Sequence, residues 1–388
     1  MTIQEAKEFI IYKTKDGRFF YRVLRDGRAE YAVGPHRICF FDRRTNLPVV
    51  LRLPDKLDSF EVAGIGPETF GKFWPLHHIV IEEGISYIGR RAFSGCRILE
   101  ILEIPRSVTR MDDEIFWEDS DPYDLTLVVE KHSYAYEYAQ KHGLYHTCSD
   151  YIDGNFHYRL DKDGNASVFR YLGKRAAHVR IPERLNGHLV TGIANDAFEK
   201  HEEIERITMP RYITRIGSGA FAGCTGLKKI DFPACLKQIG YSSFEECQKL
   251  RAVVLPANTS EIGRYAFEAC TELEYVRIPG KVKRIEERLF AGCESLRVVE
   301  LQDGVEEIME DAFYGCTELK YALLPKSVKK MENCAFERGC STVVVAEKYS
   351  YAETAAVYNE MKYMCMSKYR KERKKKTEEE EWNPFAWW

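Results

Sequence analysis

The chain has 388 residues, which exceeds what one ordinary globular core holds and favours either two or three domains or a repeat array. Its 57 Lys and Arg residues nearly balance 60 Asp and Glu residues, and the net charge of -3 argues against bulk attraction to nucleic acid. The N-terminus shows no secretory signal, and no apolar run approaches the roughly 20 residues that cross a bilayer. We therefore expect a cytoplasmic protein whose 12 cysteines stay thiols.

The chain contains an internal duplication, and each copy begins with a predicted β-hairpin. The segment from Phe20 to Gly27 resembles the segment from Phe156 to Gly164, and both are typical of two strands joined at Asp-Gly. Phe70 and Phe198, in the arrays that follow, are 128 residues apart. The duplication predicts a hairpin region with a short repeat array and helical cap (1–148), a second hairpin region with a long array and helical cap (151–365), and a charged, Trp-rich tail (366–388).

Phenylalanine recurs every 23 residues through both arrays, with an Ile or Met five residues before it and, in most units, a Cys three residues after it. Such columns are typical of a solenoid, in which each unit contacts only its neighbours. The Phe column comprises Phe70, Phe93 and Phe116 in the short array and Phe198, Phe221, Phe244, Phe267, Phe290, Phe313 and Phe336 in the long one. The Cys column comprises Cys96, Cys224, Cys247, Cys270, Cys293 and Cys316.

Each unit is predicted to form one short strand and then to return across the back of the solenoid. In the unit that begins at Leu227, apolar residues alternate at Ile230 and Phe232, which indicates a strand with one buried face. Pro233 lacks an amide N–H and ends the strand, and Gly240 is predicted to permit a tight bend before the next turn. Stacked units should form a parallel sheet and bury Leu, Ile, Phe and Cys in continuous columns.

The pattern Leu-x-x-Ile-x-Ile-Pro followed by Ile-Gly-x-x-Ala-Phe-x-x-Cys, seen in residues 216–224 and 262–270, resembles the BspA-like (Treponema-type) leucine-rich-repeat family. The resemblance covers roughly residues 50–148 and 178–365, which is most of the chain. It implies a curved solenoid used to bind proteins or glycans, often at bacterial surfaces. We therefore expect a leucine-rich-repeat solenoid, mainly parallel β with short helical turns and capping helices, in two tandem arrays.

Each array ends in a predicted capping helix. Residues 127–129 form an apolar strand that leads to Ser133, and residues 343–345 lead in the same way to Ser350. Serine is suited to the N-cap of the Ala- and Tyr-rich helix that follows in each case. A cap of this kind covers the open end of a solenoid.

The tail changes along its length from basic to acidic to aromatic. Seven Lys and Arg residues between 368 and 376 precede Glu378 to Glu381, and i,i+4 pairs between the two runs are compatible with a helix. The last seven residues include Trp382, Phe385, Trp387 and Trp388, which is an unusually high content of aromatic residues for a solvent-exposed chain end. We predict that this segment docks into a partner's groove. Alternatively, it folds back on its own solenoid or lies on a membrane surface beside the Lys/Arg run.

No catalytic, cofactor or metal site is predicted. The Cys column contains no Cys-x-x-Cys pair, so buried thiols that pack as small hydrophobic groups are favoured over a metal site or a disulfide ladder. Residues 66–72 match a phosphate-binding loop, but Phe73 stands where the Mg²⁺ ligand belongs. Residues 161–165 lack the spacing of a calcium loop, and a helix-breaking glycine separates His142 from His146. We therefore expect a protein that is not an enzyme.

The strand positions that flank the buried residues are the predicted binding surface. They should point to the concave face, which is the usual working surface of a solenoid, and they vary from unit to unit. The Tyr and Arg residues among them are of the types that dominate binding energy. In strand order the positions are Arg206 with Thr208, Lys229 with Asp231, Ala252 with Val254, Tyr275 with Arg277, Val298 with Glu300, and Tyr321 with Leu323.

Together these features predict a non-catalytic scaffold that binds another protein. The predicted contacts are Arg206, Lys229, Asp231, Tyr275, Arg277, Glu300 and Tyr321 on the concave face and Trp382, Phe385, Trp387 and Trp388 in the tail. No nucleic-acid partner is expected, membrane contact through the tail is the less favoured alternative, and the sequence indicates no oligomeric state. The alternative function is a surface or secreted adhesin-like module that binds a host protein or glycan.

Overall fold

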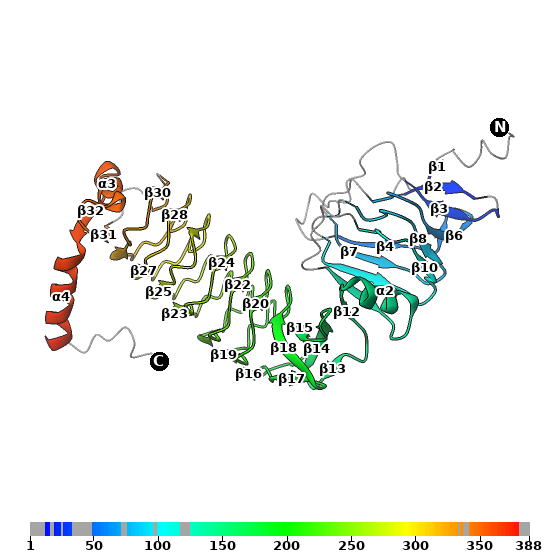
Figure 1. Cartoon of the computed structure of the whole chain (residues 1–388), viewed down its shortest axis with the longest axis horizontal. Coiled ribbons are helices and arrows are strands. Elements are labelled where there is room, and N and C mark those ends of the chain that lie inside the picture. Colours follow the sequence, from blue (N-terminus) through cyan, green and yellow to red (C-terminus); the bar gives the residue numbers. More distant parts are fainter. Residues whose placement is uncertain are drawn as a thin grey trace. The chain divides into compact units, whose positions relative to one another are not determined.

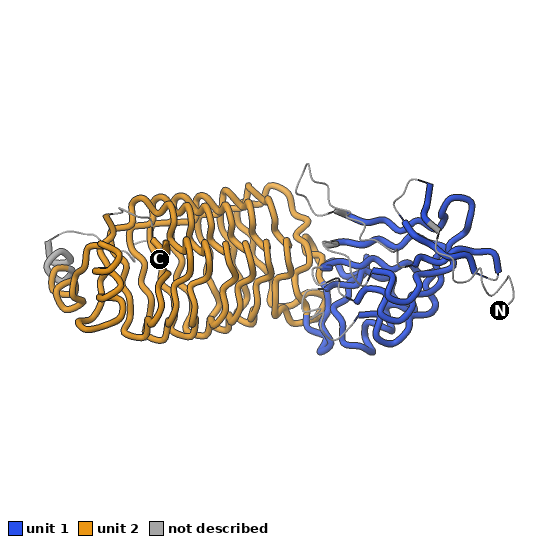
Figure 2. The backbone as a smooth tube through the Cα atoms, turned by 90° about the horizontal axis from the view of Figure 1, so that it is seen from above, with its two compact units in different colours: residues 1–152, 159–165 blue, residues 153–158, 166–388 orange. Residues whose placement is uncertain are grey.

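The chain divides into two units (Figure 2). Unit 1 comprises Met1–Ile152 and Arg159–Asn165, and unit 2 comprises Asp153–Tyr158 and Ala166–Trp388. The computed structural model describes residues 12–15, 19–24, 26–32, 49–70, 76–94, 96, 99–116, 125–332, 334–336 and 341–379. Both units contain stacked, mostly parallel strands, as the period of 23 residues predicts.

Unit 1 joins a β-hairpin to a short parallel array. Tyr21 pairs with Tyr31 in the hairpin predicted at Phe20 to Gly27, and Gly27 supplies a positive φ of 82° at the turn. Residues of both its sheets, such as Leu53, fill one core. One sheet has the order β1 (Tyr12–Lys13), β2 (Phe20–Val23), β3 (Ala29–Tyr31), β6 (Phe60–Ile65), β8 (Tyr87–Ile88) and β10 (Arg110–Met111), with β5 (Lys56–Leu57) beside β6. The other contains β4 (Val49–Leu53), β7 (Leu76–Ile81), β9 (Ile101–Ile104), β11 (Thr126–Val129) and β12 (Tyr145–Thr147).

The first predicted capping helix is α2 (Tyr134–His142). The Oγ of Ser133 accepts a hydrogen bond from the backbone N–H of Tyr136 at 3.1 Å, which is the N-cap contact that the sequence predicts. Gly143 ends the helix in the left-handed region with φ 67°. Ala135, Tyr138 and Ala139 are buried in the core of unit 1, so the helix covers the end of its array.

The second predicted hairpin is formed by β14 (Phe156–Leu160) and β15 (Ala166–Tyr171), preceded by β13 (Ile152–Asp153). The backbone N–H of Asp161 donates to the carbonyl of Asn165 at 3.0 Å and closes the turn. The Asp161 carboxylate accepts from the backbone N–H groups of Asp163 and Asn165, at 2.9 Å each. These contacts are those of a turn stabilised by its own aspartate, as the hairpin prediction requires.

Unit 2 is a longer solenoid in which each turn contributes a strand to each of two faces (Figure 1). One face contains β18 (His188–Ile193), β20 (Arg215–Ile216), β22 (Gln238–Ile239) and β24 (Glu261–Ile262), with β17 (Arg184–Leu185) beside β18, and then a separate sheet of β26 (Arg284–Ile285), β28 (Glu307–Ile308) and β30 (Lys330–Met331). The other, called the strand face, contains β16 (His178–Arg180), β19 (Arg206–Thr208) and β21 (Lys229–Asp231), and then β23 (Ala252–Val254), β25 (Tyr275–Ile278), β27 (Val298–Leu301), β29 (Tyr321–Leu323), β31 (Val343–Ala346) and β32 (Lys362–Cys365).

The core of unit 2 is a stack of phenylalanine rings, one from each turn. From Phe198 to Phe336, each ring lies nearly parallel to the next, with centroids 5.0–5.6 Å apart and interplanar angles of 2–18°. The prediction that the Phe column is core is therefore confirmed. The stack begins earlier than the period predicts, because the ring of Tyr171 on β15 stacks on Phe198 at 5.2 Å.

Gly217, Gly240 and Gly263 are needed for a reason other than the predicted tight bend. Their φ angles are not positive, so the bend itself does not require glycine. A Cβ at Gly240 would lie 2.5 Å from the backbone nitrogen of Ser218 and 2.6 Å from the carbonyl carbon of Gly217. The backbones of neighbouring turns approach too closely here to leave room for a side chain.

The predicted Cys column is buried, and each of its thiols has a hydrogen-bond acceptor. The Sγ of Cys224 donates to the carbonyl oxygen of Phe198 at 3.0 Å. The other thiols of the Cys column make the same hydrogen bond, at 3.2–3.3 Å. In each case the acceptor is the carbonyl oxygen of the phenylalanine that lies 26 residues earlier in the sequence. Burial raises the pKa of the Cys96 and Cys224 thiols to about 12. A thiol that stays protonated is a poor nucleophile and a poor metal ligand.

We predict that thiol reagents leave the Cys column unlabelled in the native protein, because these thiols are buried and protonated. Cys235 is exposed and should react at once, which makes it an internal control. After unfolding, close to 12 thiols should titrate. Mass spectrometry of labelled peptides measures each site. Rapid native labelling of Cys247 or Cys270, or disulfides at these positions, would contradict the prediction.

The second cap is α3 (Tyr351–Tyr358), and a third helix, α4 (Met366–Glu379), follows β32. The Oγ of Ser350 accepts from the backbone N–H of Glu353 at 3.3 Å, as predicted for the N-cap. Ala352, Ala355 and Ala356 of α3 are buried. None of α2, α3 and α4, the helices within the described ranges, has the length and hydrophobicity that crossing a bilayer demands.

Candidate partner-binding surface

Two rows of outward-facing residues run across the strand face. From β16 to β31, the central residue of each three-residue segment, such as Ile230 or Val276, points into the core and is at most 7% exposed. Its two neighbours point outward, because side chains alternate along a strand. The parallel register aligns the first row as His178, Arg206 and Lys229, then Ala252, Tyr275, Val298, Tyr321, Val343 and Lys362. The second row contains Arg180, Thr208 and Asp231, then Val254, Arg277, Glu300, Leu323, Val345 and Met364.

The first part of the strand face, on β16, β19 and β21, is charged. Arg206 Nη2 lies 2.8 Å from Asp231 Oδ2, and Lys229 Nζ lies 3.8 Å from Asp231 Oδ1. These three side chains are 36–46% exposed. Ion pairs this exposed contribute about 0–1 kcal/mol, so they can be exchanged for contacts with a partner at little cost.

Tyr275, Arg277 and Glu300 form a connected group near the middle of the strand face. The Tyr275 hydroxyl donates to Glu300 Oε2 at 2.8 Å, and Arg277 Nε lies 3.5 Å from Glu300 Oε1. The expectation that Tyr275, Val298 and Leu323 are exposed is wrong, because they are only 6%, 6% and 7% exposed. The repeat period specifies whether a side chain points into the core or outward. It does not specify which other residues pack against the outward-pointing side chains.

The last part of the strand face is apolar and contacts the chain's own helix α4. The ring of Tyr369 on α4 meets Tyr321 edge-on, with centroids 5.1 Å apart and an interplanar angle of 62°. Met366, at the start of α4, packs against the same cluster. The buried members of the cluster are Tyr275, Val298, Leu323, Val345 and Tyr369.

The contact between α4 and the strand face was missed by sequence reasoning. The available signal was the pair Met366 and Tyr369, which are three residues apart, share a helix face and precede a run of charged residues. The tail contacts that the sequence predicts, Trp382, Phe385, Trp387 and Trp388, lie outside the described residues.

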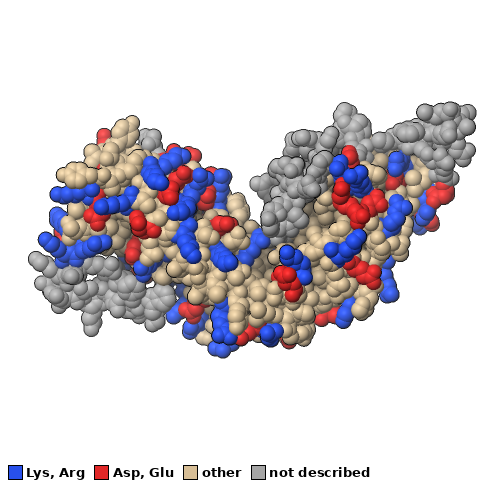
Figure 3. Space-filling model, in the orientation of Figure 1, with Lys and Arg blue, Asp and Glu red and all other residues tan. Residues whose placement is uncertain are grey.

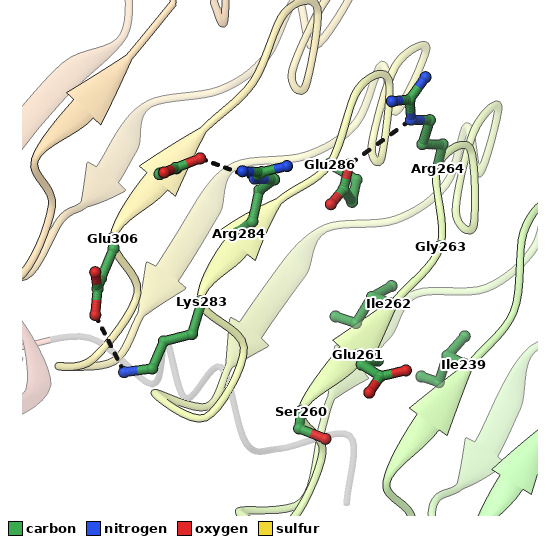
Figure 4. A pocket seen from close by; sticks show the side chains of 11 residues that line it. Ile239, Ser260, Glu261, Ile262, Gly263, Arg264, Lys283, Arg284, Glu286 and Glu306 are labelled. Atoms are coloured by element: carbon green, nitrogen blue, oxygen red, sulfur yellow. Dashed lines mark hydrogen bonds and ion pairs between the residues drawn. The ribbon is translucent and has the colours of Figure 1, made fainter.

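A pocket of about 660 Å³ lies on the face opposite the strand face, between β24 and β26 (Figure 4). It opens where one sheet ends at β24 and the next begins at β26. Lys283 Nζ lies 3.3 Å from Glu306 Oε1, and Arg284 Nε lies 2.8 Å from a carboxylate oxygen of Glu307. Because its basic and acidic side chains neutralise each other, this pocket is poorly suited to a charged ligand.

Charges of both signs are visible on the face shown in Figure 3. On the face shown in Figure 3, Lys and Arg side chains alternate with Asp and Glu side chains. Among the described residues, no group of three or more His, Cys, Asp and Glu side chains is placed to hold a metal ion.

Three solved structures are similar to this chain. The Treponema pallidum protein TpLRR is 32% identical, over 43% of this chain and 89% of that protein, with a TM-score of 0.37. A leucine rich cell surface protein from Faecalibacterium prausnitzii is 18% identical, over 76% of this chain and 95% of that protein, with a TM-score of 0.39. The pneumococcal vaccine antigen PcpA is 13% identical, over 92% and 99% of the two chains, with a TM-score of 0.38. No curated protein matches the chain.

The family comparison agrees with the repeat pattern and with the parallel solenoid. The model for the BspA type leucine rich repeat region matches in 6 copies, over residues 56–139, 191–316 and 260–363. These segments make up more than half of the chain. The resemblance inferred from the repeat pattern is thereby confirmed, and the protein belongs to the BspA-type leucine-rich-repeat family.

Proposed function

We propose that the protein is a non-catalytic scaffold that binds another protein on the strand face of unit 2. The observation that carries this proposal is the pair of outward rows, in which a uniform parallel backbone presents side chains that differ from turn to turn. Repeat solenoids commonly bind their partners on extended surfaces of this kind. Side chains that vary along the outward rows are what a specialised binding surface needs.

The strand face is suited to binding because its backbone is already ordered. Each strand is held by its neighbours in parallel register, and the Phe stack supports the sheet from below. A preorganised surface loses little conformational entropy when a partner binds. The partner's affinity can then come mainly from the outward side chains.

We assign the first contact with the partner to the charged part of the strand face. Arg206, Lys229 and Asp231 are predicted contacts whose side chains are 36–46% exposed. Charged groups on an interface steer association and fix its register. Tyr275, Arg277, Glu300 and Tyr321 continue the same rows and remain proposed contacts where the face becomes apolar.

Reversing the charges of Arg206 and Lys229 should weaken partner binding by tenfold or more, which is about 1.4 kcal/mol. The full chain first captures its partner, and the purified pair is then titrated with the wild type and with the Arg206→Glu, Lys229→Glu variant. The control is Lys281→Glu with Lys326→Glu, which makes the same charge change at exposed turn positions off the strand face. Equal loss in both variants, or loss in neither, would remove the strand face as the binding surface.

We further propose that the protein works in the cytoplasm, as a scaffold whose thiols stay reduced. The support is the Cys column, in which each Sγ donates a hydrogen bond and therefore carries its proton. Protease added to intact cells tests this proposal, because a cytoplasmic protein should stay intact under these conditions. Digestion of the protein under those conditions would favour a surface or secreted adhesin-like module that binds a host protein or glycan.

A further inference from the structure

We propose that the chain's own C-terminal segment, residues 380–388, binds the apolar part of the strand face and covers it within the same molecule. This part, called the apolar strip, consists of Val254, Tyr275, Val298, Tyr321, Leu323 and Val345. We assign this segment to the strip because helix α4, which directly precedes it in the sequence, already lies on one end of the strip.

The apolar strip is unusual for the outward side of a sheet. The same two rows carry Arg206, Lys229 and Asp231 on the earlier strands, where the sheet faces water. From β23 onward the rows become mainly apolar, with Arg277 and Glu300 as the charged exceptions on β25 and β27. A mainly apolar surface on an outward face marks a place where something else packs.

Helix α4 covers only one end of the strip. Its apolar side chains are Met366 and Tyr369, and the helix contacts β31 and β32. From Arg370 to Glu379 it carries only charged residues and Thr377. Beyond Tyr369, the sequence of α4 therefore offers no further apolar residue for the strip.

The middle of the strip, on β25 and β27, is also buried. Tyr275 and Val298 are each 6% exposed although both point outward. Tyr275 lies two strands, or about 10 Å, beyond Tyr321, which is the residue that Tyr369 contacts. An apolar cover in addition to Met366 and Tyr369 would account for this burial.

The segment that follows α4 has the composition and the reach to be that cover. Residues 380–388 include three Trp residues and Phe385, side chains that bury large apolar areas. Nine extended residues span up to about 30 Å. The strip from β31 back to β23 is about 20 Å long. Pro384 disfavours continuation of a helix through this part of the sequence.

This arrangement would make the apolar half of the strand face unavailable until the segment is displaced. A covalently attached segment acts at an effective concentration in the millimolar range, so only a partner of higher affinity replaces it. This consequence rests on the proposed function, whereas the intramolecular contact itself does not. The test below involves no partner, so its failure and the failure of the proposed function are distinguishable.

Acrylamide quenching of tryptophan fluorescence in the full chain measures whether the segment is covered. The chain has 5 Trp residues, and a variant with Trp382, Trp387 and Trp388 replaced by Phe gives the background from the other two. After subtraction, the three tail tryptophans should be quenched roughly threefold less than in a free peptide of residues 380–388, because packed rings exclude the quencher. The shielding should not change with protein concentration.

Substitutions on the strand face locate the contact. Val298→Asp, in the strip, should restore quenching to that of the free peptide, whereas Thr208→Asp, on the charged part of the same face, should leave the shielding unchanged. Melting curves check that both variants fold. Shielding that survives Val298→Asp in a folded protein would overturn the proposal. Tail tryptophans quenched like the free peptide in the wild type would do so as well.

A second measurement leaves the strip intact and so does not depend on how Val298→Asp folds. In a full-length variant with Trp382, Phe385, Trp387 and Trp388 changed to Ser, the strip is unoccupied. A fluorescent peptide of residues 380–388 should bind this variant saturably and bind the wild type at least tenfold more weakly, because the attached segment competes. No binding to the variant overturns the proposal. If the tail tryptophans are shielded only when anionic vesicles are added, the segment binds a membrane surface instead. If their shielding rises with protein concentration, the segment binds a second copy of the chain instead.

Discussion

Replacing Phe267 by alanine should lower the free energy of unfolding by about 3–5 kcal/mol. The ring is fully buried and lies between those of Phe244 and Phe290, with centroids 5.1 and 5.5 Å away. Alanine would leave a cavity in the middle of the stack. Each neighbouring ring is held on its far side by another ring, so neither can move to fill the space. Urea unfolding followed by circular dichroism measures the change.

The matched control for this substitution is Tyr314→Ala, an aromatic side chain one residue after a Phe of the stack. Tyr314 is 51% exposed, so its removal should change the free energy of unfolding by no more than about 0.5 kcal/mol. If Phe267→Ala cost as little as Tyr314→Ala, the Phe column would not be the core, and the solenoid packing would have to be abandoned.

Substituting Gly240 by alanine should lower the free energy of unfolding by about 1–3 kcal/mol, although it adds a single methyl group. The added Cβ would lie 2.5 Å from the backbone nitrogen of Ser218, so two adjacent turns would have to move apart. In the wild type, the backbone N–H of Gly240 donates a hydrogen bond to the carbonyl oxygen of Ile216, with an N···O distance of 2.9 Å. Moving the turns apart would lengthen this hydrogen bond. Equilibrium unfolding in urea gives the size of the effect.

Glu286 provides the control, because it stands at the position of Gly240 two repeats later and already has a Cβ. Its side chain lies 3.7 Å from Arg264, a weak ion pair near the surface. Glu286→Ala should therefore change the free energy of unfolding by less than about 1 kcal/mol. A Gly240→Ala protein as stable as the wild type would show that close approach of the turns is not what requires glycine.

Features that repeat with the period could be predicted from the sequence, and features that occur once could not. Phe198 to Phe336 recur in phase, and a residue in phase must occupy the same place in each turn, so their stacking followed directly. The same reasoning located the strands and the Cys column. Ser133 and Ser350 marked the capping helices because N-cap chemistry is local.

The contacts that were missed join the array to residues outside its period. Tyr171 extends the Phe stack from a hairpin strand, and Tyr369 reaches the strand face from a helix that is otherwise charged. Neither contact has a signature at fixed spacing, because each depends on where a non-repeating segment happens to pack. The burial of Tyr275 was mispredicted for the same reason. The role of Gly240 also escaped prediction, since a close approach between turns is a tertiary contact.

Lysine footprinting of the full chain, with and without the bound partner, tests most directly whether the strand face binds a protein. An acylating reagent modifies exposed lysines, and mass spectrometry then reports each site. Lys229, with its side chain 36% exposed on the charged part of the strand face, should be protected by the partner. Lys281 and Lys326, on exposed turns off that face, should react equally in both samples. Protection of Lys281 and Lys326 with Lys229 still reactive would contradict the account.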